Sequence, residues 1–200
     1  MAAKGTPWGT WDHLPLESVV DVFRDFERPW WIAGGYAIDA FAGSGRREHE
    51  DVDVSLFAAD HVAVRRHLAA WDVHAADPPG TLRPWSLDET LPADVHDAWV
   101  RRNAGDPWRV QLMLNPGGPG EFVCRRDTRI RLPLSDALWT KGGVAYLAPE
   151  IQLLFKAKGL RPKDQADFDD CLPLLSAGQC RWLHDALELT HPGHEWLGRL

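Results

Sequence analysis

Hydrophobic positions change their spacing several times along the first half of the chain. Between residues 15 and 26 they recur every three or four positions, which predicts an amphipathic helix. The apolar run 30–33 ends at two glycines and predicts a short buried strand, followed by a short helix over 36–41. Residues 51–56 alternate polar and apolar side chains, the pattern of a strand with one buried face. These changes of period predict a mixed fold of strands and helices.

The middle of the chain continues this mixed pattern. A helix is predicted over 59–71 and a short strand over 72–75. Residues 77–90 are rich in proline, glycine and aspartate and are expected to form a loop. Residues 108–114 alternate again and predict a strand, and residues 121–125 are expected to return as its hairpin partner after a Pro-Gly turn.

The last quarter of the chain is helical. Helices are predicted over 149–158, from about 162 onward, and over 179–189. The expected fold class is therefore α+β, with a small mixed sheet flanked by helices. We place a boundary near residue 145, between an α/β core of residues 1–145 and a helical C-terminal subdomain of residues 146–200.

Composition narrows the choice of partners. Hydrophobic residues make up 44% and charged residues 26%, as in ordinary globular proteins, and the eleven tryptophans are expected to anchor the core. The formal net charge is -7, which disfavours binding to nucleic acid because a phosphate backbone requires a basic face. It mildly favours a cationic substrate, although many cytosolic proteins are acidic.

Cysteine usage and hydropathy indicate a cytoplasmic protein. Cys124, Cys171 and Cys180 form no disulfide framework or zinc-finger spacing, which suits a reducing compartment. The first twelve residues are expected to form a loose arm and lack the apolar stretch of a signal peptide. No run of 18 apolar residues is present, so no membrane contact is expected. The chain is expected to be a monomer or homodimer.

The segment from residue 30 to residue 57 carries the candidate chemistry. Gly34 and Gly35 follow the predicted strand and let the backbone approach a ligand without a Cβ in the way. If Tyr36 opens a helix, the amides of Gly35 and Tyr36 point outward at its positive end, a geometry that receives phosphate.

Two aspartates follow on the next predicted strand. Asp51 and Asp53 occupy positions i and i+2, so both carboxylates project from one face, about 6–7 Å apart at the backbone. Carboxylate oxygens at that spacing can hold Mg²⁺ against a nucleotide triphosphate. Each half of the pattern is common alone, as a turn or as a solvated strand face. The two halves in this order, with a helix between them, predict a metal-nucleotide site.

This segment resembles the signature of the nucleotidyltransferase superfamily, which has the DNA polymerase beta-like fold. Residues 31–39, WIAGGYAID, and 47–53, REHEDVD, are similar to the aminoglycoside 2''-adenylyltransferase-like and lincosamide nucleotidyltransferase-like branch. Residues 147–175 more loosely resemble the helical tail of the same proteins. The resemblance implies transfer of a nucleoside monophosphate from Mg²⁺-bound ATP, or another triphosphate, to a hydroxyl of a small molecule, as in antibiotic-resistance enzymes.

The resemblance also implies roles for individual residues. Asp51 and Asp53 would ligate the metal and act in catalysis, while Gly34 and Gly35 would cradle phosphates. Tyr36 would belong to the same nucleotide-binding turn.

Other residues near this motif have both a functional and a structural interpretation. Arg47 and His49 would contact phosphate or shape the loop before the acidic strand, with His49 as a hydrogen-bonded loop histidine in the second case. Asp39 is expected to be a capping or tethering carboxylate.

The third carboxylate that the superfamily generally uses is missing from its expected place. On the strand 108–114 the polar-facing position holds Gln111, and an amide cannot take up a proton near neutral pH or give anionic charge to Mg²⁺. Four acids outside a convincing strand remain as substitutes: Asp94, Asp97, Asp106 and Asp127. Either one of them completes the site, or the protein binds nucleotide with weakened or lost transferase activity.

Two basic clusters complete the candidates. Lys156 or Lys163 would reach the triphosphate from the helical region, and the alternative is a solvated face with Lys163 paired to Asp167. The arginines of the run 125–131 would line an anion site or, by preference, an exposed hairpin edge. The acidic residues from 164 to 170 are expected at the surface or at helix caps.

We therefore predict a Mg²⁺-dependent nucleotidyltransferase that modifies a small hydroxyl-bearing molecule of the aminoglycoside or lincosamide type. Two alternatives stay open at this point. One is a nucleotide-binding or regulatory protein without transferase activity, and the other is a toxin-like transferase that acts on protein or tRNA.

Overall fold

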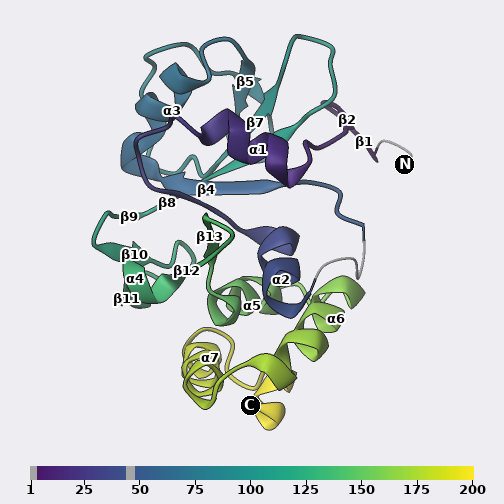
Figure 1. Ribbon diagram of the computed structural model, residues 1–200, viewed down its shortest axis with the longest axis vertical. Helices are drawn as coiled ribbons and strands as arrows, with labels where there is room; N and C mark the ends of the chain where they lie inside the picture. The colour runs from purple at the N-terminus through teal and green to yellow at the C-terminus, as the bar shows by residue number, and fades with distance from the viewer. Residues whose placement is uncertain (1–3, 44–47) are drawn as a thin grey trace.

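The computed structural model describes residues 4–43 and 48–200, and it places a mixed sheet between two groups of helices (Figure 1). The α-helices of these residues are α1 (Leu16–Phe23), α2 (Gly34–Ala42), α3 (His61–His67), α4 (Leu134–Ala137), α5 (Pro149–Ala157), α6 (Pro162–Cys171) and α7 (Ala177–Thr190). Short 3-10 helices span Ala58–Asp60, Leu172–Leu174 and Glu195–Arg199. The predicted α+β class is confirmed.

Eight strands form the main sheet. In spatial order they are β12 (Leu138–Lys141), β13 (Val144–Leu147), β3 (Trp30–Ile32), β4 (Asp53–Phe57), β8 (Val110–Asn115), β7 (Asp97–Arg101), β5 (Asp72–Ala75) and β6 (Arg83–Pro84). The β13–β3 and β4–β8 pairs are parallel, and the other neighbouring pairs are antiparallel. Because β4 lies at the centre of this sheet, its first residues are held from both sides.

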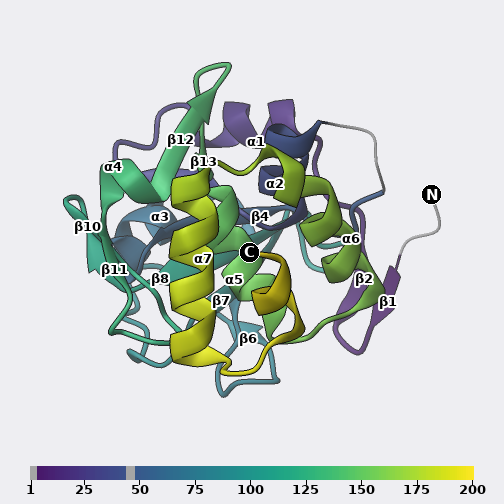
Figure 2. The ribbon, with the colours of Figure 1, turned by 90° about the horizontal axis from the view of Figure 1, so that it is seen from below.

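The two faces of the sheet belong to two hydrophobic clusters. Alternate residues of β4 and β8, such as Val54 and Leu112, pack with α1 and α3 in the first cluster. The second cluster joins Trp31 of β3 to α5, α6 and α7. Seen from below, α7 lies across the helical layer with α5 behind it (Figure 2). A strand with one side chain set in each cluster cannot slip by one residue, so the register of β4 is fixed.

The periodicity-based prediction places most elements close to their observed positions. The helix at 15–26 is α1, the strand at 72–75 is β5, and the C-terminal helices are α5, α6 and α7. Local chemistry explains the helix starts: Pro149 occupies the first turn of α5, and Ser176 caps α7 by accepting a hydrogen bond from the Gln179 amide. The predicted helix 59–71 is shorter, because α3 ends at residue 67.

Contrary to the prediction, the N-terminal segment is not a loose arm. Lys4–Thr6 (β1) and Gly9–Trp11 (β2) form an antiparallel hairpin, and Trp11 makes a parallel bridge to Trp108, just before β8. Trp11 is buried against Trp99 of β7, and the indole Nε1 of Trp108 donates to the Trp8 carbonyl at 2.9 Å. The prediction was wrong because the tryptophans that hold the hairpin lie about a hundred residues away in the sequence.

The predicted hairpin between residues 108–114 and 121–125 is also wrong. Glu121–Val123 (β10) pairs with Gly117–Gly118 (β9) and Arg131–Pro133 (β11) in a separate three-stranded sheet. The turn after β8 thus leads the chain away from the main sheet. This excursion brings the arginines that follow β10 close to α5.

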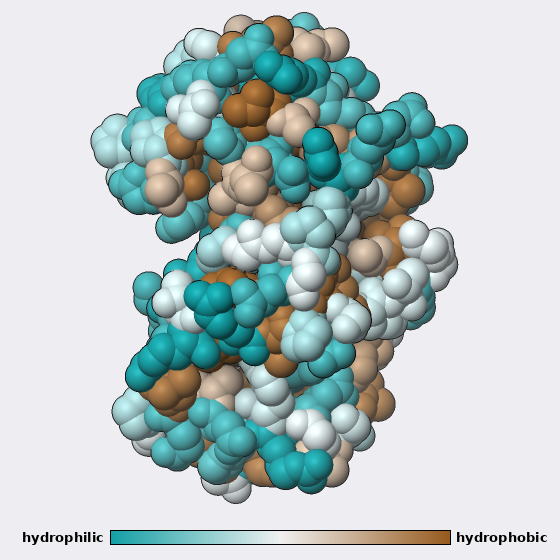
Figure 3. Space-filling model, turned by 90° about the vertical axis from the view of Figure 1, so that its left-hand side faces the viewer, coloured by the Kyte–Doolittle hydropathy of each residue, from teal (hydrophilic) through white to brown (hydrophobic). Residues whose placement is uncertain are grey.

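The surface narrows between an upper part, formed around α1 and α3, and a lower part formed around α5 to α7 (Figure 3). No helix within residues 4–43 and 48–200 is long and apolar enough to cross a membrane.

Candidate active site

A cavity of about 180 Å³ lies where the start of β4, the first turn of α2 and helices α5 and α6 meet. Carboxylates line one wall and basic side chains line another. Its lining includes Gly34, Gly35, Asp51, Asp53, Lys156 and Lys163, all of them named as candidates from the sequence. The fold therefore brings together one site from residues more than a hundred positions apart.

Asp51 and Asp53 both border this cavity. The observed strand β4 begins at Asp53, two residues later than predicted. The pairing with β8 nevertheless reaches further back, since the Gln111 amide donates to the Val52 carbonyl at 3.0 Å. Val52 and Val54 are fully buried in the opposite direction. The period of two holds across these four residues, so the two carboxylates share the cavity side.

The prediction placed the two glycines in a turn before the helix. In the structure they form the first two residues of α2. Gly34 has a φ of +65°, and a Cβ added there would lie 2.0 Å from Oδ2 of Asp53. Only glycine permits this contact, because any larger side chain would displace the carboxylate. The Gly34 amide, whose position at the helix start leaves it without an intrahelical acceptor, donates to Oε1 of Gln152 at 2.8 Å.

The electrostatics of Asp53 fit a cation. Burial, reinforced by the charges of Asp51 and Asp97, raises the pKa of Asp53 to about 7, while Lys156 and Arg125 act in the opposite direction. Two adjacent carboxylates without a cation between them repel each other. A hard divalent ion with oxygen preference would relieve this repulsion, so the donor set fits Mg²⁺. Within the described residues, no group of three or more His, Cys, Asp or Glu side chains is arranged so that it could hold a metal ion.

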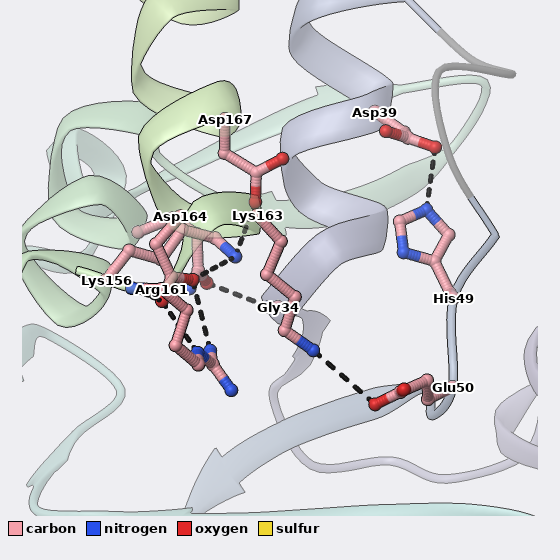
Figure 4. Close-up of polar contacts among 10 residues, drawn as sticks. Gly34, Asp39, His49, Glu50, Lys156, Arg161, Lys163, Asp164 and Asp167 are labelled. Atoms are coloured by element: carbon pink, nitrogen blue, oxygen red, sulfur yellow. Dashed lines mark hydrogen bonds and ion pairs between the residues drawn. The ribbon is translucent and has the colours of Figure 1, made fainter. Parts of the chain in front are cut away.

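Lys156 reaches the cavity wall but is held by buried acids. Its Nζ lies 2.7 Å from Oδ2 of Asp167 and 3.6 Å from Oδ1 of Asp164, and both carboxyl side chains are 1% exposed (Figure 4). The Arg161 guanidinium donates two hydrogen bonds to Asp164, at 2.7 and 3.0 Å. Both carboxylates are buried and not at the surface, but Asp164 accepts from the Arg161 backbone amide in a capping box at the start of α6, as the capping alternative predicted. For Asp167 the prediction is wrong, because its carboxylate is buried against Lys156.

Lys163 of α6 also lines the cavity. Its Nζ lies 3.5 Å from Oε2 of Glu50, which precedes the acidic strand (Figure 4). The expected pair with Asp167 is replaced, since Asp167 holds Lys156. Lys163 thus connects α6 to the segment that carries Asp51.

Arg125 and Arg126 contribute to the same cavity from the turn after β10. Nη1 of Arg126 donates to the Phe155 carbonyl, and the guanidinium of Arg125 lies 5.5 Å from the Phe155 ring centroid. The preference for an exposed hairpin edge is wrong for Arg125, which is half-buried, whereas Arg126 is exposed and also lines the cavity. It holds for Arg129 and Arg131, which form exposed ion pairs.

Gln111 and Asp97 extend the polar face of the sheet beside Asp53. Gln111 pairs directly with Asp53 across the parallel β4–β8 ladder, and its Nε2 donates to Oδ1 of Asp97 at 2.5 Å. Asp97 begins β7, a strand with alternating burial, which corrects the prediction that this acid lies outside a regular strand. An acid therefore lies on the strand next to β8, in contact with Gln111.

Comparison with known proteins identifies the family. A family model described as aminoglycoside-2''-adenylyltransferase matches residues 15–168, well over half of the chain. The chain belongs to the aminoglycoside-2''-adenylyltransferase family. The predicted resemblance is therefore confirmed. The matched range contains both aspartates, the glycine pair and Lys156.

Relatives of this family member share sequence locally and the fold globally. Over 43 residues the chain is 35% identical to a lincosamide resistance protein of Staphylococcus haemolyticus, and this match spans 22% of the chain and 26% of the relative. The lincomycin-bound crystal structure of the lincosamide antibiotic adenylyltransferase LnuA is 15% identical and aligns with a TM-score of 0.54, covering 80% of this chain and 97% of LnuA.

A second solved structure of the same fold is ANT(2'')-Ia in complex with adenylyl-2''-tobramycin. It is 13% identical, with a TM-score of 0.56, and covers 87% of this chain and 95% of ANT(2'')-Ia. At such low identity the two structures show a common nucleotidyltransferase fold.

Tyr36 and His49, two of the candidates named from the sequence, are not among the residues that line the cavity. Nε2 of His49 is 2.7 Å from Oδ2 of Asp39 on α2, and both side chains are almost fully buried (Figure 4). The Tyr36 ring packs on His49, with centroids 4.5 Å apart. These contacts tie the segment before Asp51 to α2, as in the tethering interpretation. Arg47 lies outside the described residues.

Sequence reasoning underrated Arg125, Arg126 and Gln152, and it left Asp97 among four equal candidates. The period-two pattern at 97–101 was available and could have placed Asp97 on a strand. The basic run 125–131 offered an anion site as one alternative, but no local pattern places Arg125, Arg126 or Gln152 at this cavity, because that position arises only from long-range packing.

Proposed function

We propose that this chain transfers the adenylyl group of Mg²⁺-bound ATP to a hydroxyl of a small antibiotic-like molecule, of the aminoglycoside or lincosamide type. One observation carries the proposal: the cavity joins paired carboxylates, a glycine-opened helix N-terminus and basic side chains within a single opening. Family membership and the ligands named for LnuA and ANT(2'')-Ia support the same reaction class.

In this proposal each wall of the cavity has a distinct role. Asp51 and Asp53 hold Mg²⁺, which when bound offsets negative charge on the triphosphate. The amides at the start of α2 receive a phosphate oxygen, and the Gln152 side chain exchanges its contact with Gly34 for this ligand. Residues 146–200 act as the helical subdomain that closes the cavity opposite β4.

The chemical step is an in-line displacement at the α-phosphorus of ATP. The acceptor oxygen forms a bond to this phosphorus, the bond to the β-phosphate oxygen breaks, and pyrophosphate leaves. The hydroxyl proton must go to a base. Asp97 is the carboxylate that the sheet offers beside Asp53, and the hydrogen bond from Gln111 orients it.

The second candidate function is nucleotide binding without transfer, and Gln111 favours it. In this case the amide directly opposite Asp53 removes the negative charge that a second ion would need. Asp97 then serves as a structural partner of Gln111 and has no role in proton transfer.

Asp97→Asn distinguishes the two functions. Binding of Mg²⁺-ATP is measured by calorimetry, and transfer is measured as pyrophosphate release with tobramycin and with lincomycin as acceptors. If Asp97 is the base, the variant keeps its ATP affinity while kcat falls about 10²- to 10⁴-fold. The exposed Asp94→Asn variant is the matched control and retains full activity.

Several outcomes would contradict parts of this proposal. Full activity of Asp97→Asn would exclude Asp97 as the base. Wild-type protein that binds Mg²⁺-ATP but modifies neither acceptor class would favour the second candidate function, and a gain of transfer in Gln111→Asp would establish it. Absence of Mg²⁺-ATP binding would refute both functions.

A further inference from the structure

The donors that line the cavity differ in whether the protein already occupies them. The Gly34 amide donates to Gln152, Lys163 pairs with Glu50, and Arg126 donates to the Phe155 carbonyl. Lys156, the lysine of α5, is held by buried carboxylates. Most of the basic wall is therefore satisfied by the protein itself.

The group around Lys156 carries no net charge. It contains two cations, Lys156 and Arg161, and two carboxylates, Asp164 and Asp167, within ion-pair distance. Withdrawing Lys156 toward a ligand would leave buried carboxylates without a full set of partners, which is costly. This group is better suited to joining α5 to α6 than to binding phosphate.

Arg125 differs from the other cations of this wall. Among the residues that the structure describes, its guanidinium has neither a hydrogen bond nor an ion pair, and it rests over the Phe155 ring. Its backbone is nevertheless well supported. The Cys124 amide donates to the Ile130 carbonyl at 3.0 Å, and the Ile130 amide donates to the Asp127 carbonyl at 3.0 Å.

A guanidinium with free N–H groups on a rigid turn is preorganised for an anion. Its planar fork matches two phosphate oxygens, and little conformational entropy is lost on binding. The polar face around Asp97 takes the acceptor in the proposed reaction, and in an in-line displacement the leaving group lies opposite the acceptor. Arg125, on the α5 side of the cavity, is placed for that leaving group.

We propose that Arg125 binds the terminal phosphates of ATP, the part that leaves as pyrophosphate, in the cavity that Asp51 and Asp53 also line. This inference rests on the proposed function. Arg125 would position the triphosphate. It lies outside the glycine-aspartate motif of residues 30–57, in a chain whose net charge is negative.

Arg125→Gln tests the inference by comparing two ligands. Calorimetry with Mg²⁺ measures the affinities of ATP and of AMP, which lacks the terminal phosphates. A lost charge-assisted contact weakens ATP binding about 10- to 100-fold and leaves AMP binding within about twofold. Arg125→Lys restores part of the ATP affinity, because it keeps the charge but loses the fork.

Arg129→Gln is the matched control, since Arg129 lies on the same turn, is exposed and pairs with Asp127. It leaves both affinities unchanged. Because the Arg125 guanidinium makes no hydrogen bond or ion pair with the described residues and only rests over the Phe155 ring, its replacement is expected to keep the wild-type melting temperature within about 2 °C.

The outcomes separate this inference from the proposed function. Wild-type ATP affinity in Arg125→Gln, with binding lost in Asp53→Asn, would overturn the role of Arg125 alone. Equal losses for ATP and AMP would also overturn it, because they would indicate a general change of cavity shape. Absence of Mg²⁺-ATP binding by the wild type would overturn both proposals.

Discussion

The carboxylate of Asp53 should destabilise the metal-free protein, and Asp53→Asn should relieve this cost. Burial and the neighbouring carboxylates raise the pKa of Asp53 from 3.8 to about 7. The shift is about 3 units, and at 1.36 kcal/mol per unit it corresponds to an upper limit of about 4 kcal/mol. Because the carboxylate borders an open cavity, solvent screening lowers the expected value to about 2 kcal/mol.

The pH dependence follows from the direction of this shift. A carboxyl group whose pKa is raised on folding favours the folded state when it is protonated. The destabilisation is therefore complete above about pH 7 and disappears as the pH falls toward the unfolded value of 3.8. Asp53→Asn, which is neutral throughout, should gain stability over wild type at about pH 8 and lose this advantage near pH 4.

Melting temperatures measured by circular dichroism provide the assay, in phosphate-free buffer with EDTA. For a chain of 200 residues a gain of about 2 kcal/mol corresponds to about 4–8 °C. Adding Mg²⁺ and ATP should reverse the order, since wild type gains ligand stabilisation and the variant does not. The exposed Asp94→Asn variant should match wild type at each pH.

Two results would refute this reasoning. Equal stability of Asp53→Asn and wild type at high pH would show that the charged carboxylate does not destabilise the folded state. An advantage that is the same at all pH values would show that the gain comes from packing and not from charge.

Two further substitutions probe the support of the site. Gly34→Ala should abolish Mg²⁺-ATP binding measured by calorimetry, because its Cβ would meet Asp53 Oδ2 at 2.0 Å. Gly142→Ala has a similar φ of +59° but open space around it, so it controls for the roughly 1–2 kcal/mol of backbone strain. Wild-type affinity in Gly34→Ala would disprove the contact. Lys156→Met should lower the stability by about 3 kcal/mol, or roughly 6–12 °C, because it removes the ammonium group that pairs with the buried carboxylates of Asp167 and Asp164. The exposed Lys158→Met variant is its control in thermal unfolding, and equal melting temperatures for the two variants would show that the buried ion pairs contribute no net stability.

The sequence alone determined the local part of this protein. Periodicity in residues 51–56 sets Asp51 and Asp53 on one face, since alternation is a property of consecutive residues. The glycine pair marked the start of α2 to within two residues, and proline marked the starts of α5 and α6. These signals depend on neighbours within about four positions, so they can be read without a fold.

Only the tertiary structure decided which distant residues meet this motif. The excursion after β8 places Arg125 over Phe155, and the buried ion pairs give Lys156 a structural partner in Asp167. The antiparallel pairing of β7 with β8 brings Asp97 to Gln111. Such contacts depend on strand order and helix packing, which arise from the whole hydrophobic core, and no local pattern in the chain encodes them.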